Sequence, residues 1–514
     1  MRSTFMGLET NKRGLYTQQS ALYTTGHNIS NANTLGYSRQ RVNMQATAGF
    51  PGVGLNTPTM PGFLGTGVEA GSIQRIRDSF VDQQYRQESN KLGYWESRSN
   101  AISQMEDVLA EPSAYGLQKS LSEFWSSLQQ LATDPQNGGA RAVAVERGVA
   151  VAGSFNYLHK SLTEIQTNLG QEIGVSTKDI NSIMQQIADL NRQISEVEPN
   201  GYMPNDLYDA RDLLLDELAT YVPIEVSYQK SGGRALAIAE GTVTVKIKTA
   251  GDPITVISGK DAAKMSVVGA DAEGNPTGPN NMSGFTFTAT GAATGGPLDV
   301  ADMQKSGKLK SLVDSYGYST DGGATVKGLY PEMLAKLDKM AQEFAREFND
   351  QHKQGTDLKG DPGIDFFEGG PPITAGNIKV SDDLQNDSNK VAASDSASAE
   401  VGNGKNAQKL ADIQFKPIGS SGTGLDGSTI QSYFAGIIGE LGVEGQQANK
   451  MTTNTAILLG AVSNRRDSIS SVSLDEEMTD MIRFQQAYNA SARMITVVDE
   501  TLEKIINGMG VVGR

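Results

Sequence analysis

Hydrophobic side chains recur at every seventh position near the start of the chain, at Leu8, Leu15, Leu22 and Ile29, with Phe5 ahead of them. Every seventh residue falls on one side of an α-helix, so this spacing predicts a helix with a narrow apolar stripe. A lone helix of about 30 residues with one such stripe is marginal in water. We therefore expect this segment to pack against another helix.

The end of the chain repeats the pattern. Ser473, followed by Glu476, is typical of a capping box at the start of a helix. The apolar residues on or beside the stripe of this predicted helix are Leu474, Met478, Met481, Tyr488, Ile495 and Leu502. We infer that the two terminal helices bury each other's stripes, which brings both ends of the chain together. The acidic run at 475–477 is expected to be solvated charge favoured by the helix dipole.

Helical spacing also dominates much of the middle of the chain. The longest run, 155–197, predicts a long, rod-like helix that Gly170 and Gly174 could bend. In residues 223–305 the hydrophobic period changes to two, most clearly at 242–248, and clusters of Gly, Asp, Asn and Pro separate the alternating runs. This pattern predicts a small antiparallel β domain inserted into a helical body.

The predicted fold class is therefore α+β and multidomain, with a long helical bundle built from both chain ends and an inserted antiparallel β domain. A chain of 514 residues is too long for one hydrophobic core, which agrees with several domains. We expect a terminal helical domain from 1–45 and 473–514. A mainly helical body is expected from 46–222 and 306–472, with 223–305 as the β-rich insertion.

Composition excludes several classes of protein. A formal charge of −15 without a Lys/Arg-rich face argues against nucleic-acid binding. The chain has no cysteine, which excludes disulfides and thiolate metal sites. No apolar run is long enough to span a membrane, and the last helix is too acidic for a membrane surface. The first residues lack the apolar core of a signal peptide, so we expect any export to occur without cleavage.

Residues suited to catalysis or metal binding are present but do not form a known pattern. His27, His159 and His352 are far apart in sequence and match no metal-binding motif. The aspartates at 357, 361 and 365 fail the EF-hand pattern at its Gly and distal Glu, so a polar turn is expected there. We predict no catalytic, cofactor or metal site; hydrolytic activity that depends on His352 would contradict this prediction.

Several motifs resemble those of bacterial flagellar proteins. The segment 28–37, NISNANTLGY, resembles the N-terminal signature of flagellar rod, hook and hook-associated proteins. Its motif residues are Asn28, Asn31, Asn33, Thr34, Gly36 and Tyr37. The segments 38–40, 205–217, 349–355, 473–478 and 485–493 resemble the hook-associated protein 1 family, which forms the first junction between hook and filament. Leu35 stands where many relatives carry Pro.

The resemblance implies a structural subunit of the flagellum that joins hook to filament as an adaptor in a helical assembly and permits filament growth. It implies that the terminal domain lies in the inner tube and the β-rich domain faces outward. The implied partners are further copies of the chain, the hook protein, the second junction protein and an export chaperone on the C-terminal helix. Export by the flagellar type III system without a cleaved signal, and an extracellular position at the hook–filament junction, are also implied.

Two other functions remain open from the sequence. The first, also structural, is flagellin or another axial component; it is distinguished by phenotype, because loss of a junction protein leaves hooks without filaments and releases flagellin into the medium. A surface adhesin would instead use the strands at 223–305 to bind a ligand, and deleting them would abolish binding but spare assembly.

Overall fold

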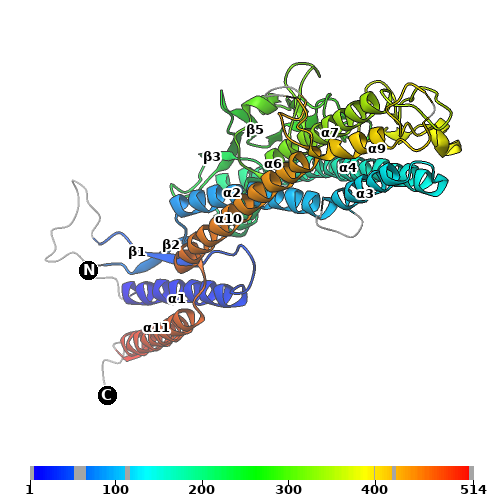
Figure 1. Ribbon diagram of the computed structural model, residues 1–514. Helices are drawn as coiled ribbons and strands as arrows, with labels where there is room; N and C mark the ends of the chain where they lie inside the picture. Colours follow the sequence, from blue (N-terminus) through cyan, green and yellow to red (C-terminus); the bar gives the residue numbers. More distant parts are fainter. Residues whose placement is uncertain (1–4, 51–64, 110–115, 399, 420–423, 509–514) are drawn as a thin grey trace.

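The computed structural model describes residues 5–50, 65–109, 116–398, 400–419 and 424–508. The outermost parts of the predicted terminal domain, 1–4 and 509–514, and the Gly- and Pro-rich segment 51–64 of the predicted body lie outside these residues. The molecule is elongated, with its first and last helices side by side at one end and the remaining helices extending away from them (Figure 1). The predicted α+β fold, with long helices at both chain ends and small antiparallel sheets in the middle, is confirmed.

The terminal part consists of α1 (Met6–Ser30), α11 (Leu474–Gly508) and a two-stranded antiparallel sheet of β1 (Gln40–Ala46) and β2 (Val68–Arg75). Gln40 pairs with Arg75 at one end of this sheet, and Ala46 pairs with Val68 at the other. Thr17 on α1 donates a hydrogen bond to the backbone oxygen of Val68 (3.2 Å). The sheet therefore lies against α1 and connects it to the body.

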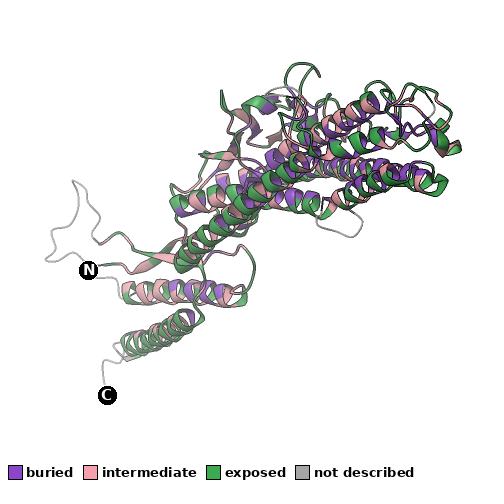
Figure 2. Ribbon diagram, in the orientation of Figure 1, coloured by how far each residue is buried: buried purple, intermediate pink, exposed green. Residues whose placement is uncertain are grey.

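The body is built from long helices with short elements between them. Its helices are α2 (Ser79–Val108), α3 (Leu117–Thr133), α4 (Gly138–Val197), α5 (Asn205–Tyr221), α6 (Lys308–Tyr316), α7 (Leu329–His352), α8 (Asp382–Asn386), α9 (Lys405–Asp412) and α10 (Ile430–Ser470). Two small antiparallel pairs join β10 (Tyr318–Ser319) to β11 (Val326–Lys327) and β12 (Phe367–Glu368) to β13 (Lys379–Val380). Burial is concentrated where these helices face one another (Figure 2).

The longest helix, α4, begins at Gly138, well before the predicted start at 155. Asn137 caps it by accepting hydrogen bonds from the N–H groups of Gly139 (2.9 Å) and Ala140 (3.3 Å). Its first turns are rich in Ala, Val and Gly, whose small side chains give a weak stripe, and this explains the late prediction. Gly170 allows a close approach, because a Cβ there would lie 2.8 Å from the ring of Tyr316.

The strands of the insertion form two antiparallel sheets. One has the order β3 (Ile224–Gln229), β4 (Thr242–Ile247), β5 (Ile254–Ser258), β6 (Asp261–Ala262), and the other has β7 (Lys264–Val267), β8 (Gly284–Thr288), β9 (Gly296–Asp299). The alternation predicted at 242–248 is confirmed, since Val243, Val245 and Ile247 are buried. Asn191 on α4 donates to the backbone oxygen of Val243 (3.0 Å). The sheets thus share the hydrophobic core of the helical body.

His352 at the end of α7 is fully buried and joins two loops through both ring nitrogens. Nδ1 donates to the backbone oxygen of Ile364 (2.6 Å), and Nε2 accepts from the N–H of Ala392 (2.9 Å). The ring lies over Phe348 at a centroid distance of 6.5 Å. These bonds require the neutral imidazole, and burial lowers the pKa of His352 to about 4. The histidine therefore has a packing role in the body core.

This burial predicts that the free energy of unfolding falls as the pH is lowered from about 6.5 to about 4. In this window the unfolded histidine binds a proton and the folded one does not, whereas above it both are neutral. The loss reaches about 3 kcal/mol at its full extent. Urea unfolding across this pH range, followed by tryptophan fluorescence, tests the wild type against His352→Gln, which keeps a donor and an acceptor without titrating. Parallel pH curves for the two proteins would contradict the prediction, and His159→Gln serves as a half-exposed control.

Candidate assembly interface

The two terminal helices run antiparallel, and the residues that face each other are spaced seven positions apart on each helix. Asn28 faces Glu477, Gly14 faces Ser491 and Gly7 faces Val498, and at the heptad step between the first two pairs Ala21 and Phe484 line one pocket. A Cβ built on Gly14 would lie 3.4 Å from Ser491 Oγ, and one on Gly7 would lie 3.7 Å from Val498 Cγ2. Small residues on α1 therefore face side chains of α11 along this line.

The predicted hydrophobic stripe of α1 lies beside this line of closest contact. Leu8, Leu15, Leu22 and Ile29 each follow a facing residue by one position and are half-buried, while Phe5 is exposed. On α11, Leu502 is buried and three stripe residues are half-buried, namely Met481, Tyr488 and Ile495. Leu474 and Met478 are exposed. The structure thus brings part of the predicted set together, and the role of these residues in assembly stays a prediction.

Sequence reasoning missed the glycines and the alanine at this contact. Gly7, Gly14 and Ala21 carry no hydrophobic signal, and glycine in a helix is normally counted against the helix. Their signal is positional, because they recur at heptad spacing one place ahead of the apolar stripe. Such spacing of small residues indicates where a second helix can approach most closely.

Asn28, the first residue of the family motif, is buried and uses both ends of its amide. Its Oδ1 accepts hydrogen bonds from Tyr37 Oη (2.8 Å) and from the N–H of Gln40 (3.0 Å). Its Nδ2 donates to the backbone oxygen of Gln40 (2.9 Å) and to Glu477 Oε2 (3.0 Å). Burial raises the pKa of Tyr37, so its hydroxyl stays protonated as a donor. Asn28 thereby links α1, β1 and α11.

The other motif residues form the turn that follows α1. Asn31 donates from Nδ2 to a backbone oxygen in the last turn of α1 (3.0 Å), and Thr34 Oγ1 donates to Asn31 Oδ1 (3.2 Å). Gly36 has φ +81°, a conformation that favours glycine, and it lies against Leu213 of α5. Asn33 is exposed. The motif therefore shapes the path from α1 to β1.

Two expectations for the start of α11 are wrong. Glu477 is 2% exposed, so it is not solvated charge; its Oε1 accepts a hydrogen bond from Arg39 Nε (2.7 Å). Glu476 does not complete a capping box, because its carboxylate pairs with Arg39 Nη1 (2.6 Å). Burial works to lower the pKa of Arg39, but these two carboxylates hold it above its usual value. Glu476 and Glu477 therefore serve tertiary contacts, while Asp475 is exposed.

A buried charge cluster attaches the terminal part to the body. Asp212 on α5 accepts hydrogen bonds from Arg77 Nη1 (2.8 Å) and Arg86 Nη2 (3.3 Å) and forms an ion pair with Arg75 Nη2 (2.9 Å). These arginines come from β2, from the link after it and from α2. Burial acts to raise the pKa of Asp212, but the arginines around it hold the pKa well below its usual range.

The same cluster extends to α10 and to the loop before β4. Arg466 on α10 contacts Asp216 Oδ2 (2.7 Å) and Asp82 Oδ1 (3.2 Å). Glu240 pairs with Arg75 and with Arg211 Nη2. The cluster thus joins β2, α2, α5 and α10 at one place. Its signal in the sequence is the recurrence of Asp residues at helical spacing on an otherwise apolar helix at 205–221.

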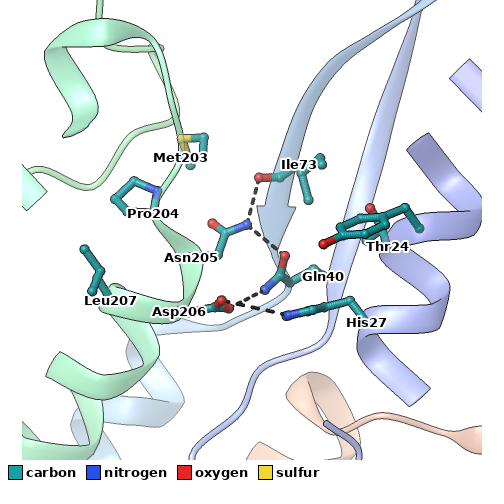
Figure 3. Close-up of a pocket in the computed structure, with 10 residues that line it drawn as sticks. Thr24, His27, Gln40, Ile73, Met203, Pro204, Asn205, Asp206 and Leu207 are labelled. Atoms are coloured by element: carbon teal, nitrogen blue, oxygen red, sulfur yellow. Dashed lines mark hydrogen bonds and ion pairs between the residues drawn. The ribbon is translucent and has the colours of Figure 1, made fainter. Parts of the chain in front are cut away.

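A cavity of about 410 Å³ lies between α1, β1–β2 and the start of α5 (Figure 3). Asn205 Nδ2 donates to Gln40 Oε1 (3.1 Å) and to the backbone oxygen of Ile73 (3.0 Å). Gln40 Nε2 donates to Asp206 Oδ1 (3.1 Å), and His27 Nε2 lies 3.9 Å from Asp206 Oδ2. These polar groups connect three elements of the fold to one another.

The described part of the chain contains neither a metal-binding group nor a membrane-spanning helix. Within it, no three His, Asp or Glu side chains are placed so that they could hold a metal ion. None of the helices in these ranges combines the length and apolarity needed to cross a membrane.

The charge cluster predicts that Asp212→Asn lowers the free energy of unfolding by about 3–5 kcal/mol, since it leaves buried arginines without their shared carboxylate. Urea denaturation at neutral pH measures the change. The matched control is Asp383→Asn, which removes an exposed pair with Lys390 and should cost less than about 1 kcal/mol. Equal effects of the two substitutions would contradict the role given to the cluster.

Comparison with known proteins agrees with this architecture. Residues 102–367 match the family of the flagellar hook-associated protein FlgK helical domain, and residues 466–508 match the C-terminal family of flagellar basal body rod FlgEFG proteins. The chain is 46% identical to flagellar hook-associated protein 1 of Bacillus subtilis (strain 168), over 100% of both chains. It is 25% identical to the protein of the same name from Escherichia coli (strain K12), covering 96% of this chain and 98% of that one.

A solved structure shares the fold. The flagellar hook junction protein FlgK from Burkholderia pseudomallei aligns with a TM-score of 0.60 and 13% sequence identity, covering 76% of this chain and 100% of that chain. Together with the full-length similarity and the matched helical domain, the comparison settles the family: the chain belongs to the flagellar hook-associated protein 1 family and is a component of the bacterial flagellum.

Proposed function

We propose that the chain is a structural subunit of the hook–filament junction, and that repeated copies of it join hook to filament in a helical assembly on which the filament can grow. The full-length similarity to flagellar hook-associated protein 1 supports the place of action. The pairing of the first and last helices supports the mode of action, because it forms one elongated end that can repeat along a tube.

The observation that carries the proposal is the apolar surface left on α11. Exposed on this helix are Leu474, Met478, Ile482, Met494, Val497, Ile505 and Ile506. Exposed apolar rows of this length indicate a contact surface for another protein. A helical array buries such a surface through heterologous contacts, in which different faces of neighbouring copies meet. The residues Leu8, Leu15, Leu22 and Ile29, half-buried beside α11, would complete the same contact.

The domain arrangement follows from this contact. Residues 1–45 and 473–514 form the inner tube, together with β2, which pairs with β1; the remainder of 46–222 and 306–472 forms the body, and 223–305 faces outward. The buried charge around Asp212 supports this arrangement, because it holds the body at a defined place beside the terminal helices. The strands share their core with α4, which favours a structural role for them over that of a separate adhesive module.

The proposed partners follow from the same position in the flagellum. They are the hook protein on the hook side, the second junction protein on the filament side, neighbouring copies of the chain around the tube and an export chaperone that covers α11 before assembly. The proposed route is type III export without a cleaved signal. The role is that of a non-enzymatic component, and the engagement of His352 with two backbone groups supports this view.

Deleting the gene is expected to leave hooks without filaments and to release flagellin into the medium, because filament growth needs the adaptor. Antibody labelling of wild-type flagella in electron micrographs is expected to give a band at the hook–filament boundary. Labelling along the whole filament would instead indicate a flagellin-like component.

Replacing Met478 with Asp is expected to block assembly while leaving the stability of the monomer unchanged, because this side chain is 55% exposed. Filament formation in cells and thermal unfolding of the purified chain measure the two effects. Gln447→Asp places the same charge at an exposed polar position of α10, outside the proposed contact surface, and is the control. Normal filaments from the Met478 variant would argue against an assembly role for this face.

A further inference from the structure

Along most of the contact between α1 and α11, the residues of α1 that face α11 are small. The α1 side presents Gly7, Gly14 and Ala21 at heptad steps, and small side chains of this kind offer little resistance to sliding. Among the described residues, the one side-chain hydrogen bond between the two helices joins Asn28 and Glu477. Specific polar contact is thus confined to one end.

Glu477 is held at that end by two groups with fixed positions. Its Oε2 accepts from Asn28 Nδ2 (3.0 Å) and its Oε1 from Arg39 Nε (2.7 Å). Arg39 is itself fixed to the body, because its backbone N–H donates to the oxygen of Ser470 at the end of α10 (2.9 Å). The carboxylate is therefore fixed relative to α1 and to α10 at once.

We propose that Glu477 is the positioning residue that sets the register of α11 on α1. Sliding by one helical turn moves α11 by about 6 Å, which separates the carboxylate from both partners while small and apolar groups still meet along the contact. A buried charge without partners is strongly unfavourable, so the slipped registers are disfavoured. A single buried polar residue fixes register in coiled coils for the same reason.

Glu477→Leu tests the inference while leaving each partner of Glu477 one other acceptor. Asn28 Nδ2 keeps the backbone oxygen of Gln40, and Arg39 keeps Glu476. Leucine also suits a helix interface, so the two helices are expected to remain in contact. The control is Glu476→Leu, which removes the exposed partner of the same arginine.

Register is read by disulfide trapping, since the natural chain has no cysteine. In the full-length chain, Gly14→Cys with Ser491→Cys reports the register of the structure. Gly14→Cys with Ala487→Cys, or with Ile495→Cys, reports a slip of one turn in either direction. Each pair is oxidised in the wild-type, Glu476→Leu and Glu477→Leu backgrounds, and the cross-linked fraction is compared on non-reducing gels.

With Glu477 present, and in the Glu476→Leu control, the Gly14–Ser491 pair is expected to dominate. In the Glu477→Leu background, the ratio of slipped to original cross-links is expected to rise about tenfold, the effect of losing hydrogen bonds to a charged group. An unchanged ratio would show that packing alone sets the register. A parallel loss of all three cross-links would show that Glu477 holds the helices together without choosing their register. Either result overturns the inference.

Discussion

The carboxylate of Asp212 is the point on which the arrangement of the chain depends. It is shared by Arg75, Arg77 and Arg86, which arrive from separate elements of the fold. Arginine forms such buried contacts well, because its planar group offers several donors in fixed directions. Orientation between the terminal helices and the body is thus specified by directional bonds, whereas the interior of the body is specified by packing.

This difference between hydrophobic packing and directional polar bonds explains which features could be predicted from the sequence. Helices, the change of period at 223–305 and the pairing of the chain ends all follow from hydrophobic spacing, and the structure contains them. The start of α4 was missed, because Ala, Val and Gly give a weak stripe over its first turns. The motifs at 28–37 and 205–217 marked the family but gave no indication of which polar side chains are buried in hydrogen-bonded networks, namely Asn28, Asn205, Asp209, Asp212 and Asp216.

The terminal helices show why spacing alone could not define the contact. Heptad leucines predict which side of α1 is apolar, but the line of closest approach is set by where the backbones can meet. Gly7 and Gly14 face Val498 and Ser491 of α11, and the leucines lie one position further along α1. Glu477 is a second example. It lies beside two other acidic residues, and nothing in the sequence indicates that it is the buried one of the three. Both the position of the contact on α1 and the burial of Glu477 are decided by residues that lie far away in the sequence.

The contrast between His352 and Asp212 has a consequence for how the molecule responds to acid. His352 lies near α9, which occupies the end of the body opposite α1 and α11 (Figure 1). Burial lowers the pKa of His352 to about 4, so the ring is protonated near that pH, whereas the pKa of Asp212 is held well below its usual range. Protonation of Nε2 would remove the acceptor for the N–H of Ala392, so acid weakens this contact at the far end of the body at a higher pH than it neutralises Asp212.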